Sequence, residues 1–91
     1  MEYEINEPRR LGGVIRELRK ERAMTQAELA LRAGVSRGYL VRLERGHPTA
    51  EIDAVLRVLR PLGARLLIGQ EIAPSEVEKE LQVQWERLIN G

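Results

Sequence analysis

Residues 25–46, TQAELALRAGVSRGYLVRLERG, hold the pattern that decides the fold. Thr25 is followed three residues later by Glu28, which is the capping-box signature of a helix start. Gly34 tolerates the positive φ at which helices commonly end, and Ser36 can cap a second helix. The stretch therefore predicts two short helices joined by a glycine-containing turn, which is the arrangement of a helix-turn-helix.

Apolar residues recur at helical spacing on both sides of this stretch as well as within it. Residues 9–22 predict a first helix, despite Gly12 and Gly13 near its start, with Arg22 at the C-terminus, where a cation is favoured. Residues 50–62 predict a fourth helix. The residues expected to face the core are Leu11, Val14, Ile15, Leu18, Leu29, Ala30, Ala33, Val35, Leu40, Leu43, Ile52, Val55, Leu56, Leu59 and Leu62.

Residues 64–70 interrupt the helical pattern, because the apolar run ARLLI lies between Gly63 and Gly69. Such a run predicts a short strand. A single strand leaves its backbone groups unpaired and therefore needs a partner. The partner is either residues 2–6 or, the alternative that we favour, a second copy of the chain across a two-fold axis. The dimerisation residues would then be Arg65, Leu66, Leu67 and Ile68.

Residues 74–90 predict a further helix, because Ser75 and Glu78 form a second capping-box signature after Pro74. Its apolar stripe packs on its own domain or dimer mate, or it docks a partner protein. The stripe consists of Val77, Leu81, Trp85 and Leu88. The expected fold is thus all-α, with a bundle of four to five helices whose helix-turn-helix domain spans residues 9–63, followed by the strand and an extra C-terminal helix.

Basic residues concentrate in the middle of the chain, although the formal net charge is only +1. Residues 1–10 carry −1, residues 11–70 carry eleven Lys and Arg against six acidic residues, or +5, and residues 71–91 carry −3. Outside this tail, every basic residue except Lys20 is Arg, the side chain best suited to bidentate contacts with phosphate and guanine. A high genomic GC content produces the same composition, so the arginines need a structural argument.

That argument comes from the second helix of the motif. At 100° per residue, its solvent face lies opposite Leu40 and Leu43. The face consists of Arg37, Gly38, Val41, Arg42 and Arg45. We expect Arg37 and Arg42 to read base edges, Val41 to contact a thymine methyl group, and Arg45 to contact phosphate. The alternative is a solvated arginine face without a DNA partner.

Residues around this face are expected to hold the DNA backbone or the fold. Gln26 and the backbone N–H of Thr25 lie at a helix N-terminus, which favours a phosphate. Tyr39, at the flank, either reaches the DNA backbone through its hydroxyl or packs half-buried. Glu44 lies at the border of the core and needs a cation, for which Arg19 is the expected mate.

Several other classes of protein find no support in the sequence. A chain of 91 residues is long enough for one domain, and cysteine is absent. His47 is the single histidine and lacks companion ligands, so we expect no catalytic site, no metal and no cofactor. The polar N-terminus and the lack of a long apolar run predict no signal peptide and no membrane segment. A cytoplasmic, nucleoid-associated protein is expected.

Residues 11–62 resemble the Cro/C1 or XRE-type helix-turn-helix family, whose fold is the lambda-repressor-like bundle. LGGVIRELRKER, TQAELALRAGVSRGYLVRLERG and AEIDAVLRVLRPLG match its helices in order. The resemblance implies that double-stranded DNA is the partner and that Gln26 contacts phosphate. It implies that bases are read from Ser36, Arg37, Gly38 and Arg42. It also implies that Arg19 and Glu44 form a buried pair.

The continuation GARLLI after the fourth helix is similar to the HipB-type antitoxins. This likeness implies a homodimer that represses its own operon and binds a HipA-type kinase toxin. The C-terminal helix departs from that pattern. A stand-alone dimeric repressor and a protein-interaction module that uses the acidic C-terminal helix are therefore the alternatives.

Overall fold

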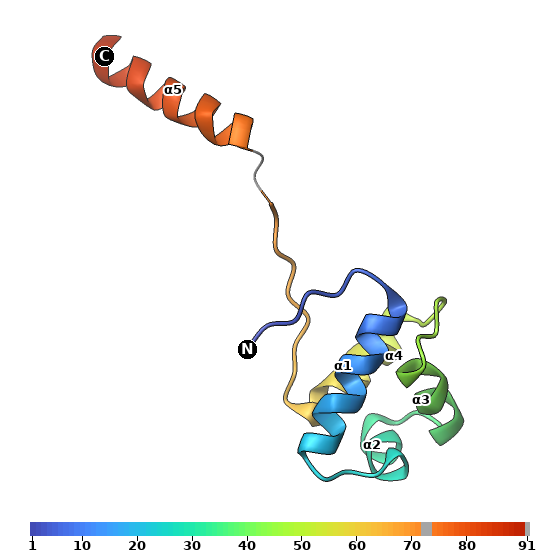
Figure 1. Ribbon diagram of the computed structural model, residues 1–91. Coiled ribbons are helices and arrows are strands. Elements are labelled where there is room, and N and C mark those ends of the chain that lie inside the picture. Colours follow the sequence, from blue (N-terminus) through green and yellow to red (C-terminus); the bar gives the residue numbers. More distant parts are fainter. Residues whose placement is uncertain (72–73, 91) are drawn as a thin grey trace.

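The computed structural model describes residues 1–71 and 74–90, without the side chains of residues 74–77. Figure 1 shows a helical bundle followed by an extended segment and a separate C-terminal helix. The elements are α1 (Pro8–Glu21), α2 (Gln26–Ala33), α3 (Arg37–Glu44), α4 (Ile52–Leu59), the 3-10 turn η1 (Arg60–Leu62) and α5 (Pro74–Asn90). The all-α expectation is confirmed.

The helix boundaries around the turn follow the local signals in the sequence. The Thr25 Oγ1 accepts a hydrogen bond from the backbone N–H of Glu28 at 3.1 Å, and the Ser36 Oγ accepts one from Tyr39 at 3.0 Å. Gly34 ends α2 in the left-handed conformation with φ of 70°. Each side-chain cap satisfies one backbone donor that the first turn of a helix leaves unpaired.

The core lies where α2 packs against α3 and α4 and where α1 packs against α3. The buried apolar residues are Val14, Ile15, Met24, Leu29, Ala30, Ala33, Leu40, Leu43, Ala54, Val55, Val58, Leu59 and Leu62. Leu11, Leu18 and Val35 pack against this core from its edge. The three helices α1, α2 and α3 therefore bury the residues that the helical periodicity predicts.

The prediction for α4 was wrong for Ile52, and Leu56, which was also predicted to face the core, is only half-buried. Ile52 is 61% exposed, whereas Val58, which was not assigned to the core, is fully buried. Ile52 is the first residue of α4, and the buried stripe runs through Ala54, Val55, Val58 and Leu59. The buried face of α4 is thus rotated about the helix axis relative to the predicted stripe. The packing of α4 against α2 determines which face is buried.

Gly12 lies inside α1 at its closest approach to the end of α3. A Cβ atom at this position would lie 2.6 Å from the carbonyl oxygen of Glu44 and also against that of Leu43. Gly46, with φ of 94°, lies equally close to Arg9, whose Cα would be 2.8 Å from an added Cβ. The two helices approach this closely because no side chain separates their backbones.

The C-terminus of α1 carries the cation that the sequence predicts there. The guanidinium of Arg22 donates a hydrogen bond to the carbonyl oxygen of Leu18 at 3.3 Å. The following residue, Ala23, adopts a positive φ of 53°. This turn directs Met24 into the core, where it is 7% exposed.

Residues 64–71 have no regular secondary structure, and neither do residues 1–6. The single chain therefore does not form the pairing of residues 64–68 with residues 2–6 that the sequence left open. Pairing with a second copy stays a prediction. None of the helices in the described ranges is both long and apolar enough to cross a bilayer.

Candidate nucleic-acid interface

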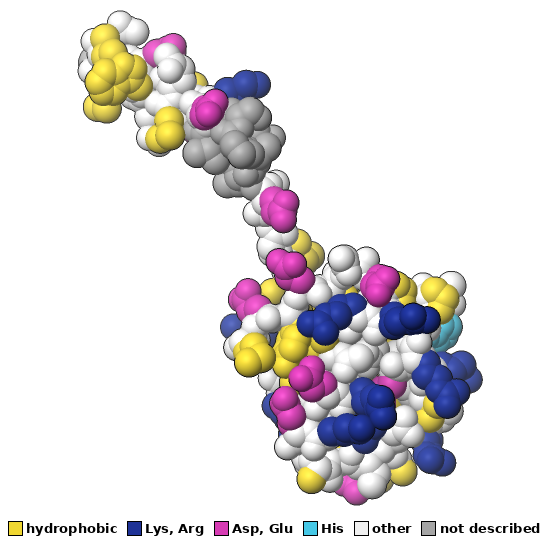
Figure 2. Space-filling model, viewed as in Figure 1, with side chains coloured by type: hydrophobic (Ala, Val, Ile, Leu, Met, Phe, Trp, Pro, Cys, Tyr) yellow, Lys and Arg dark blue, Asp and Glu magenta, His cyan; other side chains and the backbone are white. Residues whose placement is uncertain are grey.

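The solvent face of α3 presents the predicted set of residues. Ser36, Arg37, Gly38, Arg42 and Arg45 are exposed, and Val41 is half-buried. On the opposite side, Leu40 and Leu43 are fully buried. Figure 2 shows Lys and Arg side chains over the α3 side of the bundle near the single histidine, and further ones, mixed with acidic side chains, over the middle of the same face. The buried face thus holds the helix while the basic face is free to meet a polyanion.

The N-terminus of α2 adjoins this face. Thr25, Gln26 and Arg37 line one open hollow of about 500 Å³, together with Ala27 and Arg19. The hollow combines the backbone N–H groups that begin α2 with a guanidinium from the start of α3. Such a combination of a helix N-terminus and a cation suits a phosphate oxygen.

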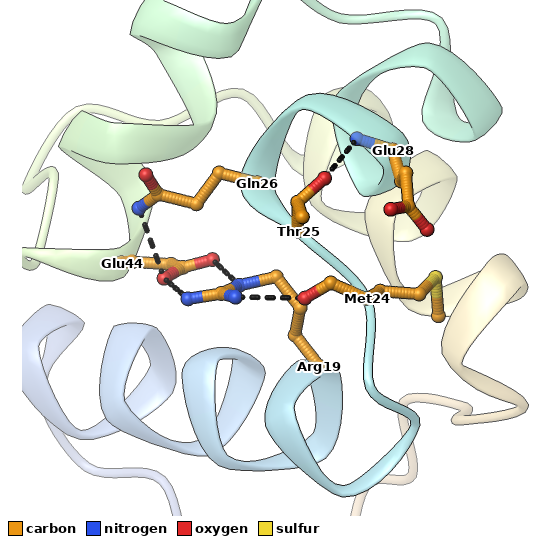
Figure 3. Close-up of polar contacts among 6 residues, drawn as sticks. All are labelled: Arg19, Met24, Thr25, Gln26, Glu28 and Glu44. Atoms are coloured by element: carbon orange, nitrogen blue, oxygen red, sulfur yellow. Dashed lines mark hydrogen bonds and ion pairs between the residues drawn. The ribbon is translucent and has the colours of Figure 1, made fainter.

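A buried polar cluster, formed by Arg19, Glu44 and the carbonyl group of Met24, joins α1, α3 and the turn before α2 beside the hollow (Figure 3). The Arg19 Nε donates to Glu44 Oε2 at 2.8 Å, and Nη2 donates to Oε1 at 3.0 Å. The third guanidinium nitrogen, Nη1, donates to the carbonyl oxygen of Met24 at 2.9 Å. The hydrogen bond from Arg19 to Glu44 raises the pKa of Arg19, against the opposing effect of burial.

Gln26 extends this polar cluster to the surface. Its Nε2 donates to Glu44 Oε1 at 3.3 Å, and its amide oxygen points away from Glu44 (Figure 3). One carboxylate therefore receives donors from two other helices. The orientation of the Gln26 amide at the α2 N-terminus depends on Glu44, which the sequence assigned only to holding α3.

Tyr39 lies half-buried at the edge of the α3 face. Its ring packs against the core, and its hydroxyl oxygen is buried without a hydrogen-bond partner among the described residues. The described chain thus shows the packing of Tyr39, and a contact of its hydroxyl with the DNA backbone stays a prediction.

The match to known proteins covers this whole arrangement. A family model described as helix-turn-helix matches residues 15–67. The HTH-type transcriptional regulator y4mF of Sinorhizobium fredii is 43% identical over 79 residues, which is 87% of this chain and all of that protein. The chain belongs to the XRE-type helix-turn-helix family. It is a helix-turn-helix transcription regulator.

Two further proteins are similar to this regulator over most of its length. The immunity repressor protein of Bacillus phage phi105 is 32% identical over 87% of the chain, which spans 56% of that protein's length. The structure of the clp gene regulator ClgR from Corynebacterium glutamicum aligns at 31% identity with a TM-score of 0.56, over 88% of this chain and 83% of that one.

The fold of the helix-turn-helix regulator is also that of HipB. HipB in two complexes with 20mers aligns with TM-scores of 0.72 and 0.71, covering 79% and 78% of this chain and all of the HipB chain. The sequence identities of 19% and 18% make this a likeness of fold.

The two other predicted sets of residues in this regulator lie outside the helix-turn-helix. Arg65, Leu66, Leu67 and Ile68 are exposed in the segment after η1. Leu81, Trp85 and Leu88 are exposed along α5, while Val77 falls outside the described side chains. Neither set comes together with the α3 face within the described chain.

Sequence reasoning missed two contributors to the interface of the helix-turn-helix regulator. Gly12 sets the distance between α1 and α3, and its signal was the glycine pair inside an otherwise regular helix. His47 contacts the ring of Tyr39, with ring centroids 5.7 Å apart, and no local pattern signals this contact. No group of three or more metal-binding side chains is found in the part of the chain that the structure describes.

Proposed function

We propose that this helix-turn-helix regulator is a transcriptional repressor that binds a palindromic operator as a homodimer. The observation that carries the proposal is the α3 face, where Arg37, Gly38 and Arg42 are exposed while the opposite side is fully buried. A dimer would place two such helices in successive major grooves about 34 Å apart.

Each residue of the solvent face of α3 has a role in this proposal. Arg37 and Arg42 form bidentate contacts to guanine, each contributing about 1 to 3 kcal/mol of discrimination. Gly38 lets the backbone approach the groove, and Val41 contacts a thymine methyl group. Arg45, near the end of the helix, contacts phosphate.

The hollow beside α3 anchors the DNA backbone. Gln26 retains a second amide hydrogen besides the one that Glu44 accepts, and it donates that hydrogen to a phosphate oxygen. The backbone N–H of Thr25 is a further donor. These contacts set the register of α3 in the groove and carry no sequence information of their own.

The dimer forms through the exposed segment from Arg65 to Ile68, paired as strands with its own copy. Leu66, Leu67 and Ile68 are 47%, 54% and 95% exposed, which supports a surface that is covered in the functional assembly. Dimerisation also doubles the charge of the basic region, which is +5 for residues 11–70 of one chain. The modest net charge of one chain therefore does not limit binding.

Selection of duplexes from a randomised library tests the proposal. We expect one palindromic sequence to be enriched and its affinity to fall steeply as salt rises, because phosphate contacts release counterions. A library that stays unenriched, with weak binding of every duplex, would contradict sequence-specific recognition.

The HipB fold favours a second, narrower role as the antitoxin of a HipBA-like system that represses its own operon in the cytoplasm. The TM-score of 0.72 over the whole HipB chain supports this role. In this role the regulator would bind a HipA-like kinase toxin. The test is whether the neighbouring reading frame encodes a kinase-like protein that forms a complex with the regulator when both are produced together. If the neighbouring reading frame encodes no such protein, the result would contradict the antitoxin role and favour a stand-alone repressor.

An alternative function rests on α5, where Leu81, Trp85 and Leu88 are 60%, 60% and 79% exposed. This apolar stripe either joins the dimer or docks a partner protein. A variant truncated after residue 71 distinguishes these two roles of α5. Loss of the dimer assigns α5 to the dimer, and unchanged dimerisation and DNA binding leave it for a partner. Docking on an apolar stripe should hardly depend on salt, in contrast to DNA binding.

A further inference from the structure

Among the exposed arginines of α3, Arg42 differs in having an aromatic neighbour among the described residues. Its Cζ lies 5.8 Å from the centroid of the Tyr39 ring. Tyr39 and Arg42 are three residues apart on one helix, which places them on adjacent positions of the same face. A guanidinium within about 6 Å of a ring centroid is attracted by the electrons of the ring face.

The Tyr39 ring on α3 is itself packed on two sides. Towards the bundle, it packs against the buried core. Towards the turn after α3, the His47 ring lies 5.7 Å away at an interplanar angle of 59°, which is within the range of tilted aromatic pairs. The ring is therefore packed on two sides and offers a fixed surface to the Arg42 side chain.

The hydroxyl group of Tyr39 does not explain why the ring is there. Its oxygen is buried and has no hydrogen-bond partner in the described chain. A buried, unpaired hydroxyl costs free energy. The ring of Tyr39, rather than its hydroxyl, is therefore the part that can act on Arg42.

We propose that Tyr39 is a positioning residue for DNA recognition, whose ring pre-orients the Arg42 guanidinium for the major groove. This inference rests on the proposed function of Arg42 as a base reader. An unrestrained arginine loses considerable rotamer freedom on binding. Tyr39 lowers that loss, and so increases both affinity and the preference for the base that Arg42 contacts.

The first test measures the free protein. In ¹⁵N relaxation, the Nε–H order parameter of Arg42 should be as high in Tyr39→Phe as in the unchanged chain, and lower in Tyr39→Leu. Tyr39→Met serves as a second ring-free variant if Tyr39→Leu does not fold, because methionine fills irregular space. Equal order parameters in all variants would overturn the inference without touching the proposed function.

The second test uses the duplex that the unchanged chain selects from a randomised library. Tyr39→Leu should bind it about twofold to fivefold more weakly, which is the range for an exposed cation–π contact, whereas Tyr39→Phe should bind as the unchanged chain does. In an Arg42→Ala background the effect of Tyr39→Leu should vanish, and in an Arg37→Ala background it should persist.

These outcomes separate the two claims. An equal loss in both backgrounds would make Tyr39 a general packing residue and overturn the inference. Enrichment of no duplex by the unchanged chain would instead contradict the proposed function, while the relaxation measurement would still decide whether Tyr39 restrains Arg42.

Discussion

Glu44 on α3 accepts both lateral donors of the Arg19 guanidinium on α1, at 2.8 and 3.0 Å, with side-chain exposures of only 3% and 10%. A bidentate pair of this kind fixes both the distance between the guanidinium and the carboxylate and the angle between their planes. Gln26 donates to the same carboxylate. This polar cluster therefore links the packing of α1 against α3 to Gln26, the residue that we assign to a DNA phosphate.

Glu44→Ala should lower the free energy of unfolding by about 3 to 5 kcal/mol, because it leaves the Arg19 charge buried and unpaired. Urea denaturation measures the loss. The double variant Arg19→Met with Glu44→Leu should lose clearly less, since neither charge remains. Equal losses for the single and double variants would show that the carboxylate contributes through packing alone.

The Arg19 contribution to stability should not change with pH across the neutral range. Its folded-state pKa is raised above the unfolded value by the hydrogen bond to Glu44. Its stabilisation is therefore complete below the unfolded pKa, and it is lost only as the pH rises through the still higher folded-state pKa. A comparison of the unchanged chain with Arg19→Met by urea denaturation at pH 7 and pH 9 should give the same difference.

Gly12→Ala should destabilise the bundle by about 1 to 3 kcal/mol, because the new methyl group would meet the carbonyl oxygens of Leu43 and Glu44. Gly13→Ala is the matched control, since nothing lies within 4 Å of its added Cβ. That variant should gain about 0.5 to 1 kcal/mol from helix propensity. Thermal melts of the two variants that shift in the same direction would refute the close-approach explanation.

Arg42→Ala should weaken binding to the selected operator by about 1 to 3 kcal/mol and relax the preference at one base pair. Arg60→Ala, which removes an exposed arginine from η1, should leave the base preference unchanged. Titration of both variants against the operator and single-base variants measures the difference. Unchanged affinity of Arg42→Ala would remove its base-reading role.

Gln26→Ala should weaken binding to the operator and to unrelated duplexes alike, by about 1.5 to 3 kcal/mol for a hydrogen bond to a charged group. A phosphate contact carries no base preference, so the specificity ratio should stay constant. A change in that ratio would indicate that Gln26 reads a base. Its stability should fall only slightly, because the bidentate Arg19–Glu44 pair remains.

Leu67→Lys should convert the dimer into monomers in light scattering, because the charge would lie in the paired strands. Leu31→Lys is the control, since Leu31 is 84% exposed on α2 and lies outside the proposed dimer contact. A Leu67→Lys variant that remains dimeric would move the dimer contact away from residues 64–70, with α5 as the next candidate.

The sequence by itself determined the features that depend on residues within about four positions of one another. Thr25 and Ser36 cap α2 and α3, Gly34 ends α2 with a positive φ, and the helical spacing predicts the buried residues of α1 to α3. These features are local, because caps and helical faces follow from the geometry of a single turn. The Arg19–Glu44 pair was also within reach, because an acid at a core border requires a cation.

Only the tertiary structure decided the features that depend on how closely two elements approach. Gly12 touches the end of α3, Ile52 faces solvent while Val58 is buried, and Gln26 donates to a carboxylate on another helix. The contact of His47 with Tyr39 likewise crosses from a turn to a helix. Crossing distances and rotations are set by the packing of all four helices together, and no periodicity within one segment contains that information.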